Sequence, residues 1–397
     1  MPGLVIHRIT PDVIYASTGN YLVGAGPVTD VGYDTKTGRE LWIQNRTYNP
    51  SWTWHAGPMA EGVYTNYVKE QLGWYGYDIY TGKQIWGPTE PRENAWGMYV
   101  GYGFMLSECI AYGKLYSSAY DGYIYAYDIK TGKKVWQFST GSSGFETPYG
   151  NWPFHASTIT VADGKIYSDT GEHSPTMPLW RGGGLYCINA TTGEFIWKIL
   201  GWYVGPVVAD GYLVSLNTGD NRIYCFGKGK TATTVTASPK VSVHGNNVLI
   251  EGTVTDQSPG AKDTPAIADA SMSAWMEYLY MQKPMPNNAT GVEVKLETLD
   301  PNGNFYEIGK ATTDTSGMFS YMWTPQVPGK YTVIATFKGS ESYWRSYAVT
   351  AVGVAEAPPA TPPLEYPQPI DPTLTIVGAA IAIIIAVAIV GIWIKRK

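Results

Sequence analysis

Two ring-bearing side chains stand next to each other at several places in the first half of the sequence, each time just before a segment that is expected to be an inner strand. The pairs are Trp54-His55, Phe154-His155 and Trp202-Tyr203. Flat rings can stack on a sugar or a peptide, and a few polar groups beside them can fix the orientation of the ligand. We therefore predict a ligand cleft, formed by Trp54, His55, Trp96, Trp152, His155, Glu172, His173, Arg181, Trp202 and Tyr203.

Two alternatives account for the same residues. The rings can pack between neighbouring sheets, with the histidines bonded to carbonyl groups of turns. His55, His155 and His173 can also be ligands of a zinc ion, which needs three or four converging side chains. Spacing along the chain does not show convergence, so no metal site is predicted. No Ser-His-Asp arrangement, phosphate loop or paired carboxylate is recognisable, and no catalytic residue is predicted.

A repeated motif indicates which elements position these residues. The motif Asp/Asn-x-x-Thr-Gly-x-x-x-Trp occurs four times, in units of about 40–60 residues. In each copy the Gly supplies a positive φ to a tight turn, the Asp or Asn bonds the turn backbone, and the Trp ends an outer strand that can pack on the next repeat. The motif residues are Asp34, Gly38, Trp42, Asp78, Gly82, Trp86, Asp128, Gly132, Trp136, Asn189, Gly193 and Trp197.

This motif resembles the tryptophan-docking repeat of the PQQ-like (quinoprotein-like) β-propellers, over about residues 4–230. That family includes quinoprotein alcohol dehydrogenases and, more distantly for this chain, BamB-like assembly factors. The resemblance implies an all-β propeller, of which about five partial blades are visible. The fifth, at residues 210–230, lacks the Thr-Gly-x-x-x-Trp ending. Because such propellers usually close with about seven or eight blades, we expect further blades and an export signal upstream of Met1.

The resemblance also raises the question of a cofactor. In the quinoprotein enzymes PQQ stacks on a Trp ring, beside a vicinal disulfide and a Ca²⁺ held by carboxylates and amides. This sequence has three separated cysteines, Cys109, Cys187 and Cys225, and no recognisable acidic cluster. No cofactor is therefore predicted, and PQQ with Ca²⁺ is kept as the alternative. Cys187 and Cys225 occupy one register of successive repeats, either as small packing residues or as a disulfide.

The second half of the sequence changes character. Residues 231–354 lose the motif and show turn signals every 8–12 residues or so, which predicts a β-sandwich resembling the immunoglobulin-like modules of surface proteins. An insertion at 264–284 is expected to contain a short helix that seals the sandwich edge, docks on the propeller or binds a partner. Residues 355–373 are rich in proline and predict a semi-rigid stalk.

The C-terminus predicts a membrane anchor. Residues 374–394 carry no charge and precede the basic tail 395–397, so we expect one transmembrane helix with a cytoplasmic tail and an ectodomain outside the cell. The order of parts resembles archaeal cell-surface PQQ-repeat proteins. Three sequons predict glycosylation at Asn45, Asn189 and Asn288. A net charge of −5 without a basic stripe argues against a nucleic-acid partner.

Together these patterns predict a membrane-anchored extracellular binding or scaffolding protein, with surface proteins or glycans as partners. One alternative is a PQQ-dependent oxidoreductase. Another is a BamB-like envelope assembly factor, which would bind extended chains along exposed strand edges. A purely structural component of the cell surface is the third.

Overall fold

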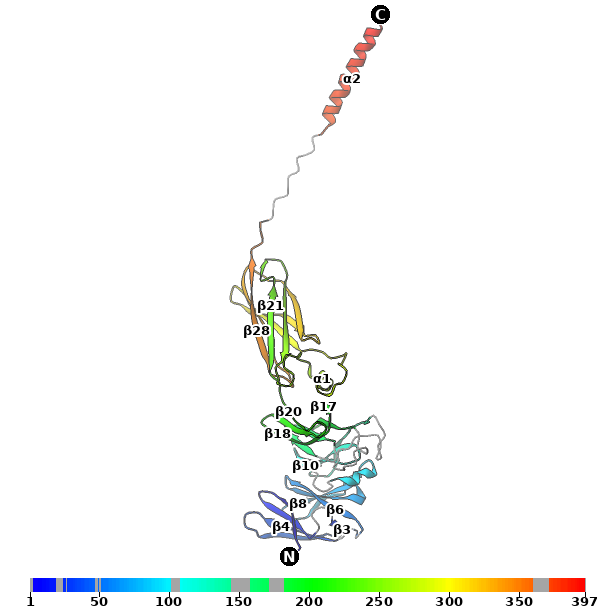
Figure 1. Cartoon of the computed structure of the whole chain (residues 1–397), viewed down its shortest axis with the longest axis vertical. Helices are drawn as coiled ribbons and strands as arrows, with labels where there is room; N and C mark the ends of the chain where they lie inside the picture. Colours follow the sequence, from blue (N-terminus) through cyan, green and yellow to red (C-terminus); the bar gives the residue numbers. More distant parts are fainter. Residues whose placement is uncertain are drawn as a thin grey trace. The chain divides into compact units, whose positions relative to one another are not determined.

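The computed structural model describes residues 3–18, 24–25, 27–46, 49, 51–100, 108–143, 158–170, 182–359 and 371–396. The chain divides into two compact units, Met1–Ala355 and Glu356–Lys397. The first unit consists mainly of β-sheets, and the second contains the helix α2 (Thr373–Ile394) (Figure 1). Each unit is described by itself.

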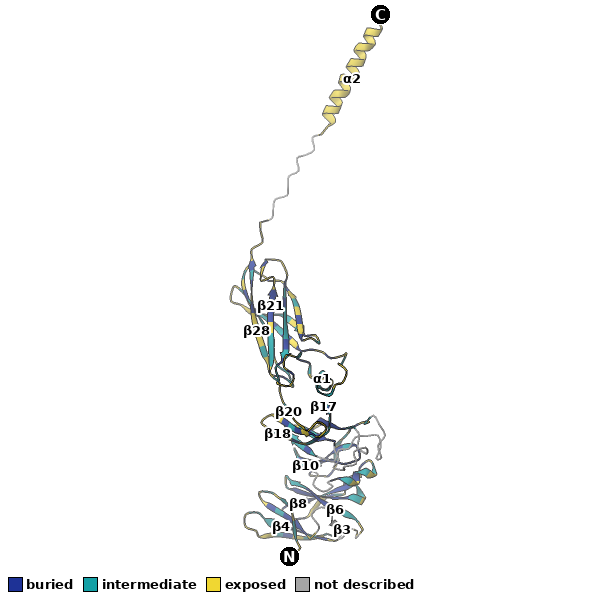
Figure 2. Cartoon of the chain, in the orientation of Figure 1, coloured by how far each residue is buried: buried dark blue, intermediate teal, exposed yellow. Residues whose placement is uncertain are grey.

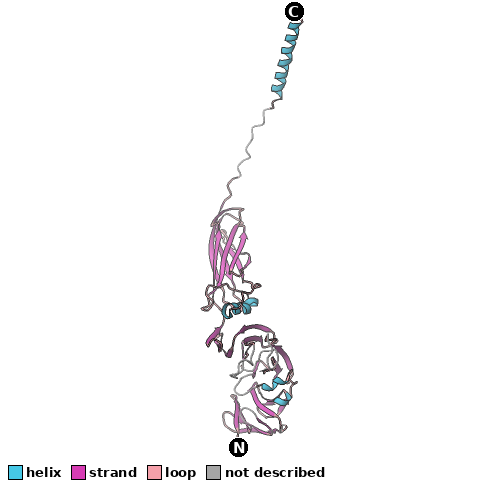
Figure 3. Cartoon of the chain, turned by 45° about the vertical axis from the view of Figure 1, so that its right-hand side comes forward, coloured by secondary structure: helices cyan, strands magenta, loops and turns pink. Residues whose placement is uncertain are grey.

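Five antiparallel sheets follow one another in the described part of residues 3–226 (Figure 3). The first sheet consists of β1 (Val5–Ile9), β2 (Val13–Ser17), β4 (Val28–Asp34) and β5 (Glu40–Arg46). The second consists of β3 (Gly24–Ala25), β6 (Thr53–Ala60), β7 (Val63–Val68), β8 (Gly73–Asp78) and β9 (Gln84–Trp86). A short 3-10 helix, η1 (Lys69–Gln71), connects β7 to β8.

The remaining three sheets follow the same order of strands. The third consists of β10 (Glu108–Ala111), β11 (Lys114–Ser118), β12 (Tyr123–Asp128) and β13 (Lys134–Ser139). The fourth consists of β14 (Ile159–Ala162), β15 (Lys165–Asp169), β16 (Gly184–Asn189) and β17 (Phe195–Leu200). The fifth has only β18 (Tyr203–Ala209), β19 (Tyr212–Asn217) and β20 (Arg222–Phe226). Successive sheets contact one another through β1, β6, β10, β14 and β18, in that order.

The repeated turn explains why each outer strand folds back. In the third sheet, Oδ1 of Asp128 accepts hydrogen bonds from the backbone N–H and the hydroxyl of Thr131, at 2.9 and 2.8 Å. Gly132 then takes a φ of 69°, which a residue with a Cβ adopts only under strain. In the fourth sheet Asn189 accepts only from the backbone N–H groups of Thr191 and Thr192. The turn thus depends on the Asx side chain in all cases.

The motif tryptophans join each sheet to the next. The indole Nε1 of Trp42 donates to the carbonyl of Ile79 at 2.7 Å, and Trp86 bonds Ile129 at the same distance. Trp136 reaches the carbonyl of Ala190 at 3.3 Å. Each of these rings also covers the turn glycine of the following sheet, where an added Cβ would come closer than 3.0 Å. These glycines are Gly82, Gly132 and Gly193.

Residues 231–355 form two further sheets. One consists of β21 (Thr231–Ser238), β23 (Val248–Asp256) and β26 (Met318–Trp323). The other consists of β22 (Val241–Val243), β28 (Ser346–Ala355), β27 (Gly329–Phe337), β24 (Glu293–Leu299) and β25 (Phe305–Thr312). Apolar residues of both sheets share one core, which includes Val248, Ile250, Leu296 and Val333. The immunoglobulin-like assignment stays a prediction.

The expected insertion contains the helix α1 (Asp269–Met281). Trp275, 3% exposed, packs on Ile267 and Ala289, next to the sandwich. Met276 and Met281 join the core of the fourth and fifth sheets instead. Ser273 is also bonded to the backbone of Lys198 in β17. The helix therefore both seals the edge of the sandwich and docks on the repeat array.

The helix α2 is exposed along its length (Figure 2) and is long and apolar enough to cross a membrane. It matches the predicted span 374–394 to within one residue. Most of the expected stalk, 360–370, lies outside the described residues. All three cysteines are free; Cys187 is buried and Cys225 is exposed, so they form no disulfide.

Candidate functional site

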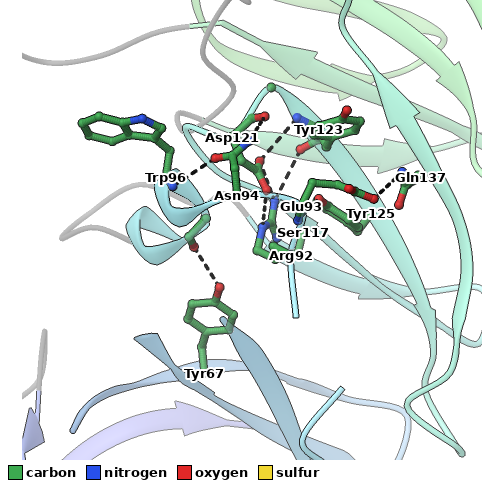
Figure 4. Close-up of polar contacts among 12 residues, drawn as sticks. Tyr67, Arg92, Glu93, Asn94, Trp96, Ser117, Asp121, Tyr123, Tyr125 and Gln137 are labelled. Carbon is green, nitrogen blue, oxygen red and sulfur yellow. Dashed lines mark hydrogen bonds and ion pairs between the residues drawn. The ribbon is translucent and has the colours of Figure 1, made fainter. Parts of the chain in front are cut away.

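A buried ion pair forms the base of the site. Arg92 lies between the second and third sheets, and Asp121 lies in the turn between β11 and β12 (Figure 4). The Nε atom of Arg92 donates to Oδ2 of Asp121 at 2.7 Å, and Nη2 donates to Oδ1 at 3.1 Å. Nη1 donates to the hydroxyl of Ser117 at 3.1 Å. The guanidinium carbon also lies 4.1 Å from the ring centre of Tyr125.

Both charged side chains are completely shielded from solvent. Burial disfavours the charged guanidinium, but the Asp121 carboxylate outweighs this effect and raises the pKa of Arg92 above its ordinary value. The guanidinium of Arg92 thus keeps its charge at neutral pH, and both oxygens of Asp121 accept hydrogen bonds from it. The ion pair between Arg92 and Asp121 holds residues 92–94 against the third sheet.

The segment that follows is the 3-10 helix η2 (Ala95–Tyr99). The side chain of Asn94 caps it, because Oδ1 accepts from the N–H of Trp96 at 3.0 Å. Nδ2 of Asn94 donates to the carbonyl of Asp121 at 3.1 Å. From the second sheet, the buried hydroxyl of Tyr67 donates to the carbonyl of Gly97 at 2.8 Å. Two sheets therefore fix the position of η2.

This anchoring places Trp96 in a group of four rings, called here the aromatic cluster: Trp96, Tyr99, Tyr120 and Trp202. Trp96 and Tyr99 are stacked with ring centres 5.7 Å apart, and Tyr99 stacks on Tyr120 at 5.1 Å. Tyr120 is buried, whereas the other three are half-buried. The cluster thus holds three half-buried rings on a fixed base, which suits the binding of apolar or planar groups.

Trp202 comes to the cluster from the loop between β17 and β18. Its backbone N–H donates to Oδ1 of Asn217 at 3.2 Å. The indole lies close to Gly183 and Gly219, where an added Cβ would come closer than 3.0 Å to the ring. The two glycines therefore leave room for the ring, and the Asn217 amide holds the backbone of Trp202. A hollow of about 310 Å³ lies beside it, lined in part by Asp220, Tyr280 and Gln282.

The other predicted cleft residues that the structure describes are packing residues. Trp54, 1% exposed, belongs to the core between the first and second sheets. His55, 3% exposed, points to the opposite face, where Nε2 lies 3.6 Å from Oε1 of Glu108. Tyr203 is fully buried with the fourth and fifth sheets. Among the described residues, the packing alternative accounts for these three.

Five predicted cleft residues lie outside the described part of the chain: Trp152, His155, Glu172, His173 and Arg181. The zinc alternative includes two of them, His155 and His173. Within the described ranges no three His, Cys, Asp or Glu side chains are grouped as metal ligands.

The three sequons have different surroundings: Asn45 and Asn288 are exposed, whereas the side chain of Asn189 is engaged in its turn. Glycosylation stays a prediction.

Sequence reasoning missed Arg92, Asp121, Tyr99 and Tyr120. Arg92 is in a Pro-rich connection, PTEPREN, and Asp121 is in an Asp-Gly turn. For Arg92 and Asp121 a signal was available, because each carries a charge close to strands that contain mainly apolar or aromatic residues. That signal points to a buried pair but does not identify the partners.

In a comparison with protein-family models, the model described as outer membrane protein assembly factor BamB matches residues 120–246. The chain is a PQQ-like repeat protein. The prediction of a PQQ-like β-propeller is thereby confirmed, and the five sheets of residues 3–226 are its repeats. No curated protein matches the sequence of this PQQ-like repeat protein at a significant level.

Several solved structures are similar to this PQQ-like repeat protein at low identity. BamB from Moraxella catarrhalis is 14% identical, with 80% of this chain and 83% of that chain covered and a TM-score of 0.35. The quinohemoprotein alcohol dehydrogenase from Comamonas testosteroni is 12% identical, with coverages of 89% and 68% and a TM-score of 0.35. The computationally designed Ika8 protein is 11% identical, with coverages of 81% and 71% and a TM-score of 0.37.

The described residues of this PQQ-like protein do not fit the cofactor that the family implies. A Ca²⁺ beside the quinone needs about 6–8 oxygen ligands. Asp121, the carboxylate in the turn beside the aromatic cluster, has both oxygens on Arg92. Glu108 lies against His55, and the cysteines are separate and free. We therefore assign no step through PQQ.

Proposed function

We propose that this protein is a membrane-anchored binding protein, whose propeller presents the aromatic cluster to protein partners outside the cell. The observation that supports the proposal most is the fixed base under the cluster. Arg92 and Asp121 hold η2 rigidly, so Trp96 and Tyr99 lose little conformational freedom when a partner covers them. Partly exposed Trp and Tyr residues on a rigid base are typical of binding hot spots.

The polar groups beneath the cluster support binding over catalysis. A general acid, base or nucleophile must reach a substrate atom directly or through one water. Asp121 uses its carboxylate oxygens on Arg92, and Arg92 donates to Asp121, Ser117 and the carbonyl of Tyr123. These groups therefore hold the backbone. The helix α2 supports the anchoring part of the proposal by its length and apolarity.

The test compares partners cross-linked to the full chain in native membranes. The variant Trp96→Ala/Trp202→Ala removes two rings of the cluster, and the matched control Met322→Ala/Tyr347→Ala removes two side chains that are 57% and 66% exposed on the sandwich. We expect the recovery of specific protein adducts to fall at least 10-fold with the first variant only. Equal recovery from both variants would refute the role of the cluster. Recovery of a cross-linked glycan that depends on the cluster, with no protein adduct, would overturn the proposed partner class.

A further inference from the structure

In the described part of the chain, the fifth sheet has no counterpart of the outer strand that each of the four preceding sheets has: β5, β9, β13 and β17. Strand β20 pairs with β19, and within the described ranges no strand pairs with its other edge. The equivalent strand of the third sheet, β12, pairs with β11 on one edge and with β13 on the other. The register identifies the equivalent residues: Val214 opposite Cys225 corresponds to Tyr116 opposite Ala126.

Two side chains of β20 are exposed on the face that the following sheet covers in the earlier repeats, as when Leu185 of the fourth sheet packs with Tyr203 and Leu213 of the fifth. Ile223 is 73% exposed, although the residues at its position in the four preceding sheets are 0% exposed: Asp30, Trp74, Ile124 and Leu185. Cys225 is also exposed. The residues at its position in the other sheets are buried, and each is paired with an outer-strand tryptophan: Gly32, Gly76, Ala126 and Cys187.

The edge of β20 has little protection against pairing. Natural edge strands are commonly blunted by charged side chains, Pro or bulges, because their unpaired N–H and C=O groups accept another strand. β20 has one charged residue, Arg222 at its start, and continues with Ile223, Tyr224, Cys225 and Phe226. Its backbone is thus available to an added strand.

We propose that this edge binds an extended segment of a partner protein as a fourth, antiparallel strand. The inference rests on the proposed binding function and names the chemistry of one partner. The other sheets define that chemistry, since a Trp lies opposite the position of Cys225 in all four. Two residues after this Trp, Phe138 and Ile199 lie opposite Ile124 and Leu185, the apolar residues at the position of Ile223. In the first sheet that position is Asp30, and polar Gln44 lies opposite it, so the apolar Ile223 calls for an apolar partner. The segment recognised is therefore Trp-x-apolar, in an extended conformation with unblocked backbone N–H groups.

The first test uses a synthetic peptide with the sequence of residues 133–140, KKVWQFST, which contains strand β13. It is titrated into the purified full chain in detergent. We expect saturable binding that weakens at least 10-fold with Ile223→Lys, and that is unchanged with the control Val349→Lys, at a residue 52% exposed on the sandwich. Alternate N-methylation of the peptide should abolish binding. Equal binding to both variants, or no binding to the native chain, would overturn the proposal.

The second test examines the register. A peptide with Cys in place of its Trp, activated as a thionitrobenzoate disulfide, should exchange with the Cys225 thiol at least 10 times faster than a peptide whose activated Cys is one residue further along. Equal rates would contradict the register. Concentration-dependent self-association that the peptide disperses would show that a second copy occupies the edge, and would overturn the proposed partner. Loss of peptide binding with retained cluster-dependent adducts would refute this inference alone.

Discussion

Arg92 and Asp121 form a two-pronged ion pair in which neither side chain is exposed to solvent, with N–O distances of 2.7 and 3.1 Å. The two residues come from different elements, and their pairing fixes η2 to the third sheet. A charge that loses its partner in such a place cannot regain hydration. The pair is therefore a weak point of the fold as well as the base of the aromatic cluster.

The first prediction concerns removal of one member of this pair. Asp121→Asn should lower the free energy of unfolding by about 3–5 kcal/mol, because the Arg92 charge stays buried without a counter-charge. Denaturant unfolding of the full chain in detergent measures the change. The control is Asp163→Asn, which breaks the ion pair with Lys165 at a carboxylate that is 89% exposed, and its effect on unfolding should be much smaller because water screens the pair. A similar effect of both substitutions would contradict the role assigned to burial.

The second prediction isolates the contact between a tryptophan and the next turn. Gly38 and Gly132 have φ values of 70° and 69°, so Ala at either position costs about 1–2 kcal/mol of backbone strain. Only Gly132 is covered by the Trp86 ring; nothing lies within 4 Å of a Cβ built at Gly38. Gly132→Ala should therefore cost about 1–3 kcal/mol more than Gly38→Ala in unfolding experiments. Equal costs would show that the ring contact contributes nothing.

The third prediction concerns pH. His7 is 6% exposed, and burial followed by the charge of Arg8 lowers its pKa from 6.5 to about 4. Between pH 6.5 and about pH 4 the unfolded chain binds a proton at His7 more strongly than the folded chain does. The contribution of neutral His7 to the free energy of unfolding is therefore complete above pH 6.5 and is lost as the pH falls to about 4. The loss should reach up to about 3 kcal/mol. Unfolding measured from pH 7 to pH 4 should show a smaller decrease in His7→Gln, and an unchanged profile would refute the assignment.

The fourth prediction concerns topology. Cys225 is exposed, whereas Cys187 is fully buried, and burial raises its pKa to about 12. A membrane-impermeant maleimide added to intact cells should therefore label the native chain at Cys225 if the propeller lies outside. Cys225→Ser should lose most of the label. Labelling only after the membrane is opened would place the propeller on the cytoplasmic side.

Much of the fold could be predicted because its signals are local. The Asp–Thr–Gly turn depends on hydrogen bonds within four residues, as between Asp34 and Thr37, so the sequence alone reveals it. The apolar run of α2 is likewise visible without any tertiary contact. The missing strand of the fifth sheet could also be inferred, because the Thr-Gly-x-x-x-Trp ending is absent after Arg222.

The site could be predicted only in part, because burial in a stack of sheets is not local. Trp54 and His55 point to opposite faces of β6, and an isolated sheet with one wet face would expose one of them. Here one face packs on the first sheet and the other lies against Glu108 of the third, so both side chains are buried. Trp96 and Trp202, 106 positions apart in the sequence, both pack against Tyr120, which no motif encodes.

The central claim is that partners bind at the aromatic cluster, and site-specific photo-cross-linking tests it most directly. Met98 lies in η2 between Trp96 and Tyr99 and is 38% exposed, so a photoreactive amino acid at this position should report on the cluster. In native membranes we predict a discrete protein adduct from position 98 that disappears with Trp202→Ala, and no such adduct from position 241, which is 70% exposed on the sandwich. The same adduct from both positions, or an adduct from position 98 that survives Trp202→Ala, would contradict the account.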